Sequence, residues 1–143
     1  MDKLREVQRA SVGSREFVWN LPGEYRFIHV SDSAVLQPVE AGLWFNAQMI
    51  SFADLAKNDQ AWKRDFKTVE DHWVNELGAK PHMGKLWGFG NTAEGTVEPF
   101  SDGFACSIYS DATKAKFSAY RKRQDPEGLF FSGLGVKLLG PCK

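Results

Sequence analysis

The chain has 143 residues, of which 43% are hydrophobic and 25% are charged, and this is the size and composition of one globular domain. Its 18 basic residues balance 18 acidic ones, which leaves no cationic surplus for nucleic-acid binding. No run of about 18 apolar residues occurs, and no apolar signal stretch follows the charged start. We therefore expect no nucleic-acid partner and no membrane span, and the cellular compartment stays open.

The predicted elements begin with a polar segment, residues 1–16, which forms either an arm or a short helix over Asp2–Arg9. A strand is expected near Phe17–Trp19, and a second over Glu24–Val30, where β-branched and aromatic residues dominate. Gly42–Ile50 is a third strand candidate.

Alternation along these strands assigns their side chains to faces. Glu24 and Arg26 share one face of the second strand. Apolar side chains occur on both of its faces, which predicts a strand that is covered on both sides. In the third strand, Asn46 and Gln48 are polar among large apolar groups.

The strongest helix signal follows the third strand. Apolar residues recur there at steps of three and four, as on one face of an α-helix; they are Trp62, Phe66, Val69, Trp73 and Leu77. Asn58 or Asp59 can cap the start of this helix, and Gly78 can end it. A loop over Gly78–Lys85 comes next.

The C-terminal part of the chain predicts shorter elements. Phe104–Tyr109 is a strand candidate, Ser110 caps a helix that runs to about Arg123, and Asp125–Gly128 is a turn. The tail, Leu129–Leu139, is apolar and interrupted by glycine. Strands and helices are mixed without strict alternation, which favours the α+β class, with an antiparallel sheet and flanking helices.

Common catalytic signatures are absent from the sequence: a phosphate-binding glycine loop, a serine nucleophile elbow, His-Glu-x-x-His and Cys-x-x-Cys. Cys106 and Cys142 are too few for a disulfide scaffold and lack metal-ligand spacing, so no metal site is expected. His29 and His72 are expected to be structural. Aromatic residues make up 13% of the chain, which favours a heavily packed core or an aromatic-lined pocket.

Three polar groups remain as candidate site residues. Glu24 and Arg26 form either a simple salt bridge or a pair that moves protons or gates a pocket. Asn46 is either a satisfied polar group at a sheet edge or an amide that orients a substrate hydroxyl. The glycine-containing loop that ends at Lys85 is either an ordinary exposed loop or one that presents His82 and Lys85 to a site.

Three sequence motifs resemble, in their order, those of FAD-linked oxidases of the vanillyl-alcohol oxidase superfamily. Asn20–Phe27 resembles the strand that bears their Glu-x-Arg pair. Lys80–Lys85 is similar to the sugar-lactone oxidase motif Pro-His-Trp-Gly-Lys, with Met83 in place of Trp. The stretch 117–130 is similar to their C-terminal helix and Asp-Pro turn. The agreement spans about 17–140, with cholesterol oxidases as the closest resemblance and aldonolactone and alditol oxidases more distant.

The resemblance implies both a fold and a partner. Residues 17–143 would be part of the cap, or substrate-binding, domain together with the C-terminal tail, and the FAD-binding domain would be absent from this chain. That domain, or a subunit that contains it, would be the partner. Alone, the chain would be inactive and would self-associate through exposed aromatic side chains.

The resemblance also implies a reaction and residue roles. In such enzymes an alcohol C–H delivers hydride to flavin N5, and O₂ reoxidises the flavin. Lys85 would stabilise the anionic reduced flavin, and His82 would contact flavin and substrate from the same loop. Glu24 and Arg26 would handle protons or gate substrate and O₂, and Asn46 would contact the substrate hydroxyl.

Two departures from the family pattern bear on the substrate and on the tail. Met83 in place of a large aromatic argues against a sugar lactone, so an apolar alcohol or sterol is expected. Phe130-Phe131-Ser132 stands where the family has a terminal Phe-x-Asn, which alters a contact to the rest of the protein. The competing hypothesis is a stand-alone module that kept the cap fold and binds an apolar ligand without redox chemistry.

Overall fold

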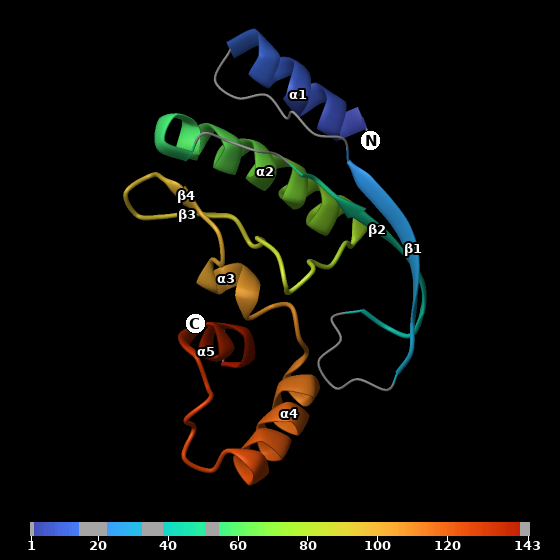
Figure 1. Cartoon of the computed structure of the whole chain (residues 1–143), viewed down its shortest axis with the longest axis vertical. Helices are drawn as coiled ribbons and strands as arrows, with labels where there is room; N and C mark the ends of the chain where they lie inside the picture. The colour runs from blue at the N-terminus through green and yellow to red at the C-terminus, as the bar shows by residue number, and fades with distance from the viewer. Residues whose placement is uncertain (1, 15–22, 33–38, 51–54, 141–143) are drawn as a thin grey trace.

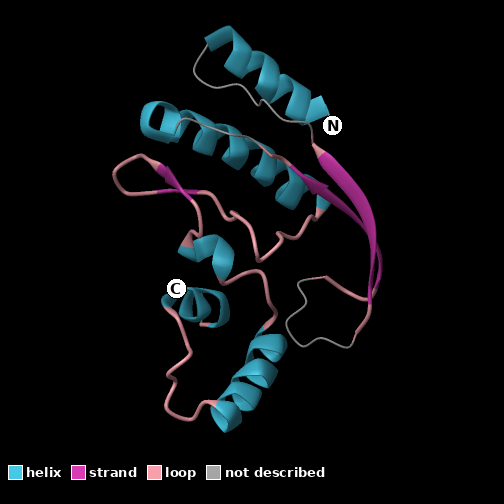
Figure 2. Ribbon diagram, in the orientation of Figure 1, coloured by secondary structure: helices cyan, strands magenta, loops and turns pink. Residues whose placement is uncertain are grey.

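Helices and two small antiparallel sheets make up the described part of the chain, as the α+β prediction requires (Figures 1 and 2). The structure, a computed structural model, describes residues 2–14, 23–32, 39–50 and 55–140. In chain order the elements are α1 (Asp2–Ser14), β1 (Glu24–Val30), β2 (Gly42–Gln48), α2 (Leu55–Leu77), β3 (Gly90–Asn91), β4 (Val97–Glu98), α3 (Asp102–Ala105), α4 (Asp111–Gln124) and α5 (Gly133–Leu139). The strand expected near Phe17–Trp19 lies outside the described residues.

Helices α1 and α2 pack side by side at one end of the molecule (Figure 1). Helix α1 takes the helical alternative for the N-terminal segment and continues beyond the predicted end at Arg9. Helix α2 begins ahead of the predicted caps and ends where predicted, before Gly78, whose φ of +65° is available to glycine without strain. Beyond this glycine, the N–H of Ala79 donates to the carbonyl of Trp73 at 2.9 Å.

Strands β1 and β2 form an antiparallel hairpin that runs along one side of the molecule (Figure 2). The pairing runs from Glu24 opposite Gln48 to Val30 opposite Gly42. Directly opposed side chains lie on the same face of a sheet, so the hairpin has two different faces. The polar face carries Glu24, Arg26, Asn46 and Gln48 at one end and the apolar Ile28 and Trp44 further along, and the aromatic face carries Tyr25, Phe27, Leu43 and Phe45.

The aromatic face is exposed, so the prediction of a strand covered on both sides is wrong. Phe27 is 73% exposed and Leu43 is 71% exposed. Phe45 lies between Tyr25 and Phe27, with ring centroids 5.7 Å and 5.5 Å away, but Phe27 and Phe45 still remain largely exposed. Among the described elements, β1 and β2 make substantial contact only with one another, and burial of a strand face requires a second layer.

The core lies around a short segment, Trp87–Phe89, which runs between two apolar clusters. One cluster consists of Trp62, Phe89 and Val97, with Ala61 and Phe66 packed against it. The other consists of Trp87, Ile108 and Tyr109, with Met83, Phe100, Phe104, Leu138 and Leu139 packed against it. Trp87 is 1% exposed, so this segment joins the N-terminal and C-terminal halves of the fold.

The long helix is tied to the second hairpin through polar side chains. Gln60 accepts the N–H of Val97 at 2.7 Å, and the buried Lys63 pairs with Glu98 at 2.7 Å. Between β3 and β4, the N–H of Gly95 donates to the carbonyl of Thr92 at 3.1 Å. This bond closes the turn that joins β3 to β4.

In the C-terminal part, one prediction fails and two hold. Phe104–Tyr109 is helical at its start rather than extended, because α3 begins there after Ser101 and packs against α5. Ser110 caps α4, with its hydroxyl oxygen accepting the N–H of Thr113 at 3.2 Å. The turn at Asp125 closes through a bond of 3.2 Å from the N–H of Gly128. Both confirmed features are local, whereas α3 depends on packing.

Two further facts complete the description. The buried Cys106 is disulfide-bonded. No helix of the described ranges has the length and apolar character needed to span a membrane.

Candidate functional site

The polar face of the hairpin brings two predicted site residues into direct contact. Arg26 Nη2 pairs with Glu24 Oε1 across one strand position. Gln48, opposite Glu24 on β2, donates its amide to the other carboxylate oxygen. Both side chains of the ion pair are about half exposed, at 46% and 53%. The pair predicted from alternation is therefore real, and it faces open surface.

Asn46 lies next to this pair, because it is the register partner of Arg26. Its side chain is half-buried and makes no hydrogen bond with any residue that the structure describes. A primary amide offers two donors and one acceptor. The Asn46 amide is therefore open to hydrogen bonds from water or from a ligand. Gln48 belongs to the same face, and its signal in the sequence is the even spacing from Asn46.

The other two predicted site residues, His82 and Lys85, lie on the loop that follows α2, and both are exposed. The N–H of Lys85 donates to the carbonyl of His82 at 3.1 Å, which closes a tight turn. Within it, the N–H of Gly84 donates to His82 Nδ1 at 3.0 Å. In a neutral ring the proton then resides on Nε2. A Cβ at position 84 would lie 3.0 Å from His82 Cε1, so glycine is needed for this ring position.

Met83 lies between His82 and Lys85 in sequence. Its side chain packs toward the core, whereas those of His82 and Lys85 are exposed. Its half-buried side chain contacts the cluster of Trp87, Ile108 and Tyr109. The residue type at position 83 therefore affects the packing of the apolar cluster beneath the loop. The argument that Met83 excludes a lactone substrate loses its basis, since this side chain is a core residue.

Glu70 is a residue that the sequence interpretation missed. Its two carboxylate oxygens accept the N–H groups of Gly88 and Phe89, at 2.7 Å and 2.8 Å. Burial raises the pKa of Glu70, against the opposing effect of these two hydrogen bonds. The signal was present: a carboxylate four positions after Phe66 stands within the apolar stripe of the helix. Glu70 thus anchors the segment that directly follows the loop of His82 and Lys85.

The structure does not join the two groups of site residues. No hydrogen bond or ion pair links the polar face to His82 or Lys85 in the described ranges. The Lys85 ammonium has no carboxylate partner there either. An exposed, uncompensated cation is the donor chemistry that an anionic flavin ring requires, so Lys85 fits one end of a flavin site.

The remaining histidines do not add to the site. His72 pairs with Glu76 at 3.0 Å on the surface of α2, as a structural residue does. His29, expected to be structural, is exposed on the aromatic face of the hairpin, which no described element covers. Within the described residues, no group of three His, Cys, Asp or Glu side chains is placed to hold a metal.

The chain matches the D-arabinono-1,4-lactone oxidase family over residues 1–137. Neither the curated proteins nor the solved structures contain a significant match. The family match supports an FAD-linked oxidase-type domain, as the three motifs indicate. It gives no support to a specific relation with cholesterol oxidases, and the lactone-oxidase resemblance, taken above as the more distant one, is the one it supports. The chain belongs to the D-arabinono-1,4-lactone oxidase family.

Proposed function

We propose that this chain supplies the substrate-side surface of an FAD-linked oxidase whose substrate is a polyhydroxylated lactone. The observation that carries the proposal is the polar face of the hairpin. Glu24 and Arg26 are paired there, and the Asn46 amide beside them is unbonded within the described residues. Such a surface offers donors and acceptors to several hydroxyl groups at once.

The same observation favours a lactone over the sterol expected from Met83. A sterol presents mainly hydrocarbon, and its burial against carboxylate, guanidinium and amide groups would leave those groups without hydrogen-bond partners. The most exposed apolar side chains of the hairpin, Phe27, Leu43 and Phe45, lie on its aromatic face, whereas Ile28 and Trp44 share the face of the site residues further along the strands. The family match to a lactone oxidase points the same way.

Oxidation of a secondary alcohol to a ketone removes a hydride, which carries both electrons, from carbon and a proton from the hydroxyl oxygen. FAD, when bound, accepts the electrons and passes them to O₂. Asn46 would orient the reacting hydroxyl, and Glu24 would take up its proton, since each carboxylate oxygen retains a lone pair beyond its present bond. Arg26 would hold Glu24 in position and bind a second substrate oxygen.

Lys85 would contribute charge rather than proton transfer. An ammonium without a neighbouring carboxylate favours negative charge placed next to it. His82 would present its Nε2–H from the same turn, because Nδ1 is occupied by the N–H of Gly84. Glu70 would act through the backbone, by holding the segment that the loop enters.

A second candidate function has one observation in its favour. The aromatic face exposes Phe27, Leu43 and Phe45, at 73%, 71% and 58%. A stand-alone module that binds an apolar ligand, or that self-associates, would use this face. The two functions differ in which side of the hairpin is occupied.

The first experiment is size-exclusion chromatography of the native chain from its host lysate, with flavin absorbance recorded. Elution with a larger yellow polypeptide supports the oxidase, whereas elution alone and without colour supports the binding module. The isolated chain should form no peroxide from D-arabinono-1,4-lactone.

The second experiment uses the flavin-containing assembly. With D-arabinono-1,4-lactone as the substrate, Lys85→Ala should slow flavin reduction on the order of 10²-fold, as loss of an electrostatic stabiliser does. Lys80→Ala, an exposed lysine of the same loop, is the matched control and should stay within about twofold. Cholesterol should not reduce the flavin. Reduction by cholesterol, or an equal effect of the two lysine variants, would contradict the assignment.

A further inference from the structure

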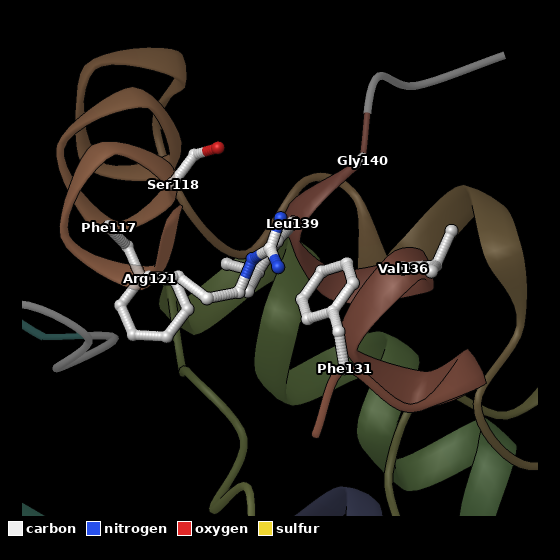
Figure 3. Close-up of a pocket in the computed structure, with 7 residues that line it drawn as sticks. All are labelled: Phe117, Ser118, Arg121, Phe131, Val136, Leu139 and Gly140. Atoms are coloured by element: carbon white, nitrogen blue, oxygen red, sulfur yellow. The ribbon is translucent and has the colours of Figure 1, made fainter. Parts of the chain in front are cut away.

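A small pocket between α4 and α5 lies outside the residues assigned to oxidation. It has a volume of about 110 Å³ and is lined by Phe117, Ser118, Arg121, Phe131, Val136, Leu139 and Gly140. Its walls are mostly apolar, and its polar groups are the guanidinium of Arg121 and the hydroxyl of Ser118. Figure 3 shows the guanidinium extending from α4 toward α5, beside the ring of Phe131.

Arg121 lacks an acceptor in the described part of the chain. Its guanidinium carbon lies 4.3 Å from the centroid of the Phe131 ring. Asp125 is the nearest carboxylate, but Nη1 and Oδ2 are 3.9 Å apart, which is too long for a hydrogen bond. The two oxygens of Asp125 instead accept the N–H groups of Leu129 and Phe130, at 2.8 Å and 3.1 Å. The five N–H donors of Arg121 are therefore available.

The side chain of Arg121 is partly buried, which makes the lack of a hydrogen-bond acceptor costly. Its side chain is 22% exposed, so part of the guanidinium is removed from water; among the described residues Asp125 is its charge partner at 3.9 Å, and no hydrogen-bond acceptor meets it. The hydroxyl of Ser118 likewise makes no hydrogen bond with a described residue. A partly buried cation beside apolar walls is best satisfied by an anion that also has an apolar part.

Helix α4, which forms one side of the pocket, carries a positive charge that would attract an anion. The chain as a whole is neutral, but α4 carries five basic residues against the single acid Asp111. This surplus raises the local concentration of anions near the pocket.

We propose that this pocket binds a short-chain aliphatic carboxylate, with the carboxylate on Arg121 and Ser118 and the alkyl chain against Phe131 and Leu139. The pocket, at about 110 Å³, is smaller than an apolar cavity of about 150 Å³ that holds one benzene molecule, which favours a short alkyl chain. The site is separate from the oxidase surface, so the proposal stands or falls independently of that function.

The test is an NMR titration of the full 143-residue chain with sodium butyrate. We expect saturable shifts confined to the backbone signals of 117–121, 131 and 136–140. The alcohol 1-butanol and sulfate, which each carry one half of the required chemistry, should bind at least about tenfold more weakly, as the loss of a charge-assisted contact predicts. Equal binding of either probe would overturn the proposal.

Variants locate the binding groups. Arg121→Gln should weaken butyrate binding about tenfold or more. Arg123→Gln is the matched control: it removes the same charge from the same helix, and Arg123 also lies over a ring, Tyr120, at 5.9 Å, but does not line the pocket. Ser118→Leu should block the pocket and abolish binding even if Arg121→Gln fails to fold. Unchanged binding in Ser118→Leu, or equal losses in the two arginine variants, would refute the site.

Discussion

The β1–β2 hairpin and the Trp87–Phe89 segment differ in how much of the fold packs around them. The hairpin displays Glu24 and Arg26 on a two-stranded arm whose main contacts are internal. The segment Trp87–Phe89 lies between two apolar clusters, with backbone N–H groups that donate to Glu70. Substitutions on the hairpin should therefore change ligand affinity more than the free energy of unfolding. Substitutions around the segment should change the free energy of unfolding more than ligand affinity.

The largest expected effect is the loss of Trp87. Trp87→Ala should lower the free energy of unfolding by about 3–5 kcal/mol, because it empties a fully buried site. Phe27→Ala is the matched aromatic truncation on the hairpin, and it should cost under about 1 kcal/mol, because the ring is 73% exposed. Denaturant unfolding measures both values. Similar losses in the two variants would show that the hairpin is packed against something in solution.

The next effect concerns the partly buried carboxylate of Glu70. Glu70→Ala leaves the N–H groups of Gly88 and Phe89 without their acceptor, which should cost about 1–3 kcal/mol. Glu76→Ala, at an exposed position of the same helix, should change stability by less than about 0.5 kcal/mol. Hydrogen exchange of these two amides should accelerate in Glu70→Ala alone.

The pH dependence of Glu70 has a definite sign. Burial raises its pKa above the usual 4.5, so the folded chain binds this proton more tightly than the unfolded chain. The resulting stability is present below pH 4.5 and is lost as the pH rises through the raised pKa. Compared with Glu70→Gln, whose side chain does not titrate, the wild-type chain should lose free energy of unfolding as the pH rises from 4.5 through the raised pKa of Glu70. A difference that stays flat with pH, measured by urea unfolding, would contradict the sign.

A smaller effect is expected at Gly84. Gly84→Ala places a Cβ against the His82 ring and disrupts the bond from the Gly84 N–H, at a cost of about 0.5–1.5 kcal/mol. Gly103→Ala, where no atom lies within 4 Å of the added carbon, should be neutral or slightly stabilising. The ¹⁵N signals of the His82 ring should report the change of tautomer populations in Gly84→Ala only.

The smallest effect on stability should come from the polar face. Arg26→Ala removes a half-exposed ion pair, which contributes at most about 1 kcal/mol. Its consequence should appear in substrate affinity instead. A loss above about 2 kcal/mol in thermal or denaturant unfolding would mean that the pair holds the hairpin together.

The elements that could be predicted from the sequence are those with local causes. The alternation of side chains predicted the strands that carry Glu24, Arg26 and Asn46. Apolar residues at steps of three and four predicted helix α2 and its end before Gly78. The cap at Ser110 rests on its side-chain hydroxyl, which accepts the N–H of Thr113, and the turn at Asp125 rests on a backbone bond from Gly128 and on side-chain bonds to Leu129 and Phe130. Each signal acts within a few residues, so one sequence is enough to detect it.

What could not be predicted depends on distant neighbours. The exposure of Phe27 reflects the absence of a covering layer in the described structure, which no pattern within a strand encodes. Helix α3 is too short to form without its packing against α5. Glu70 meets Phe89 across 19 positions, and Met83 turns inward because a cluster contributed by later residues receives it.

The inward orientation of Met83 has a consequence for how members of this family are compared. If the side chain between His82 and Gly84 is chosen by the cluster beneath it, its identity across related sequences should co-vary with the residues at positions 108 and 109. It should vary independently of the substrate that each enzyme oxidises. A search pattern that insists on an aromatic at this position would then discard true relatives, and one that scores only the flanking histidine, glycine and lysine would keep them.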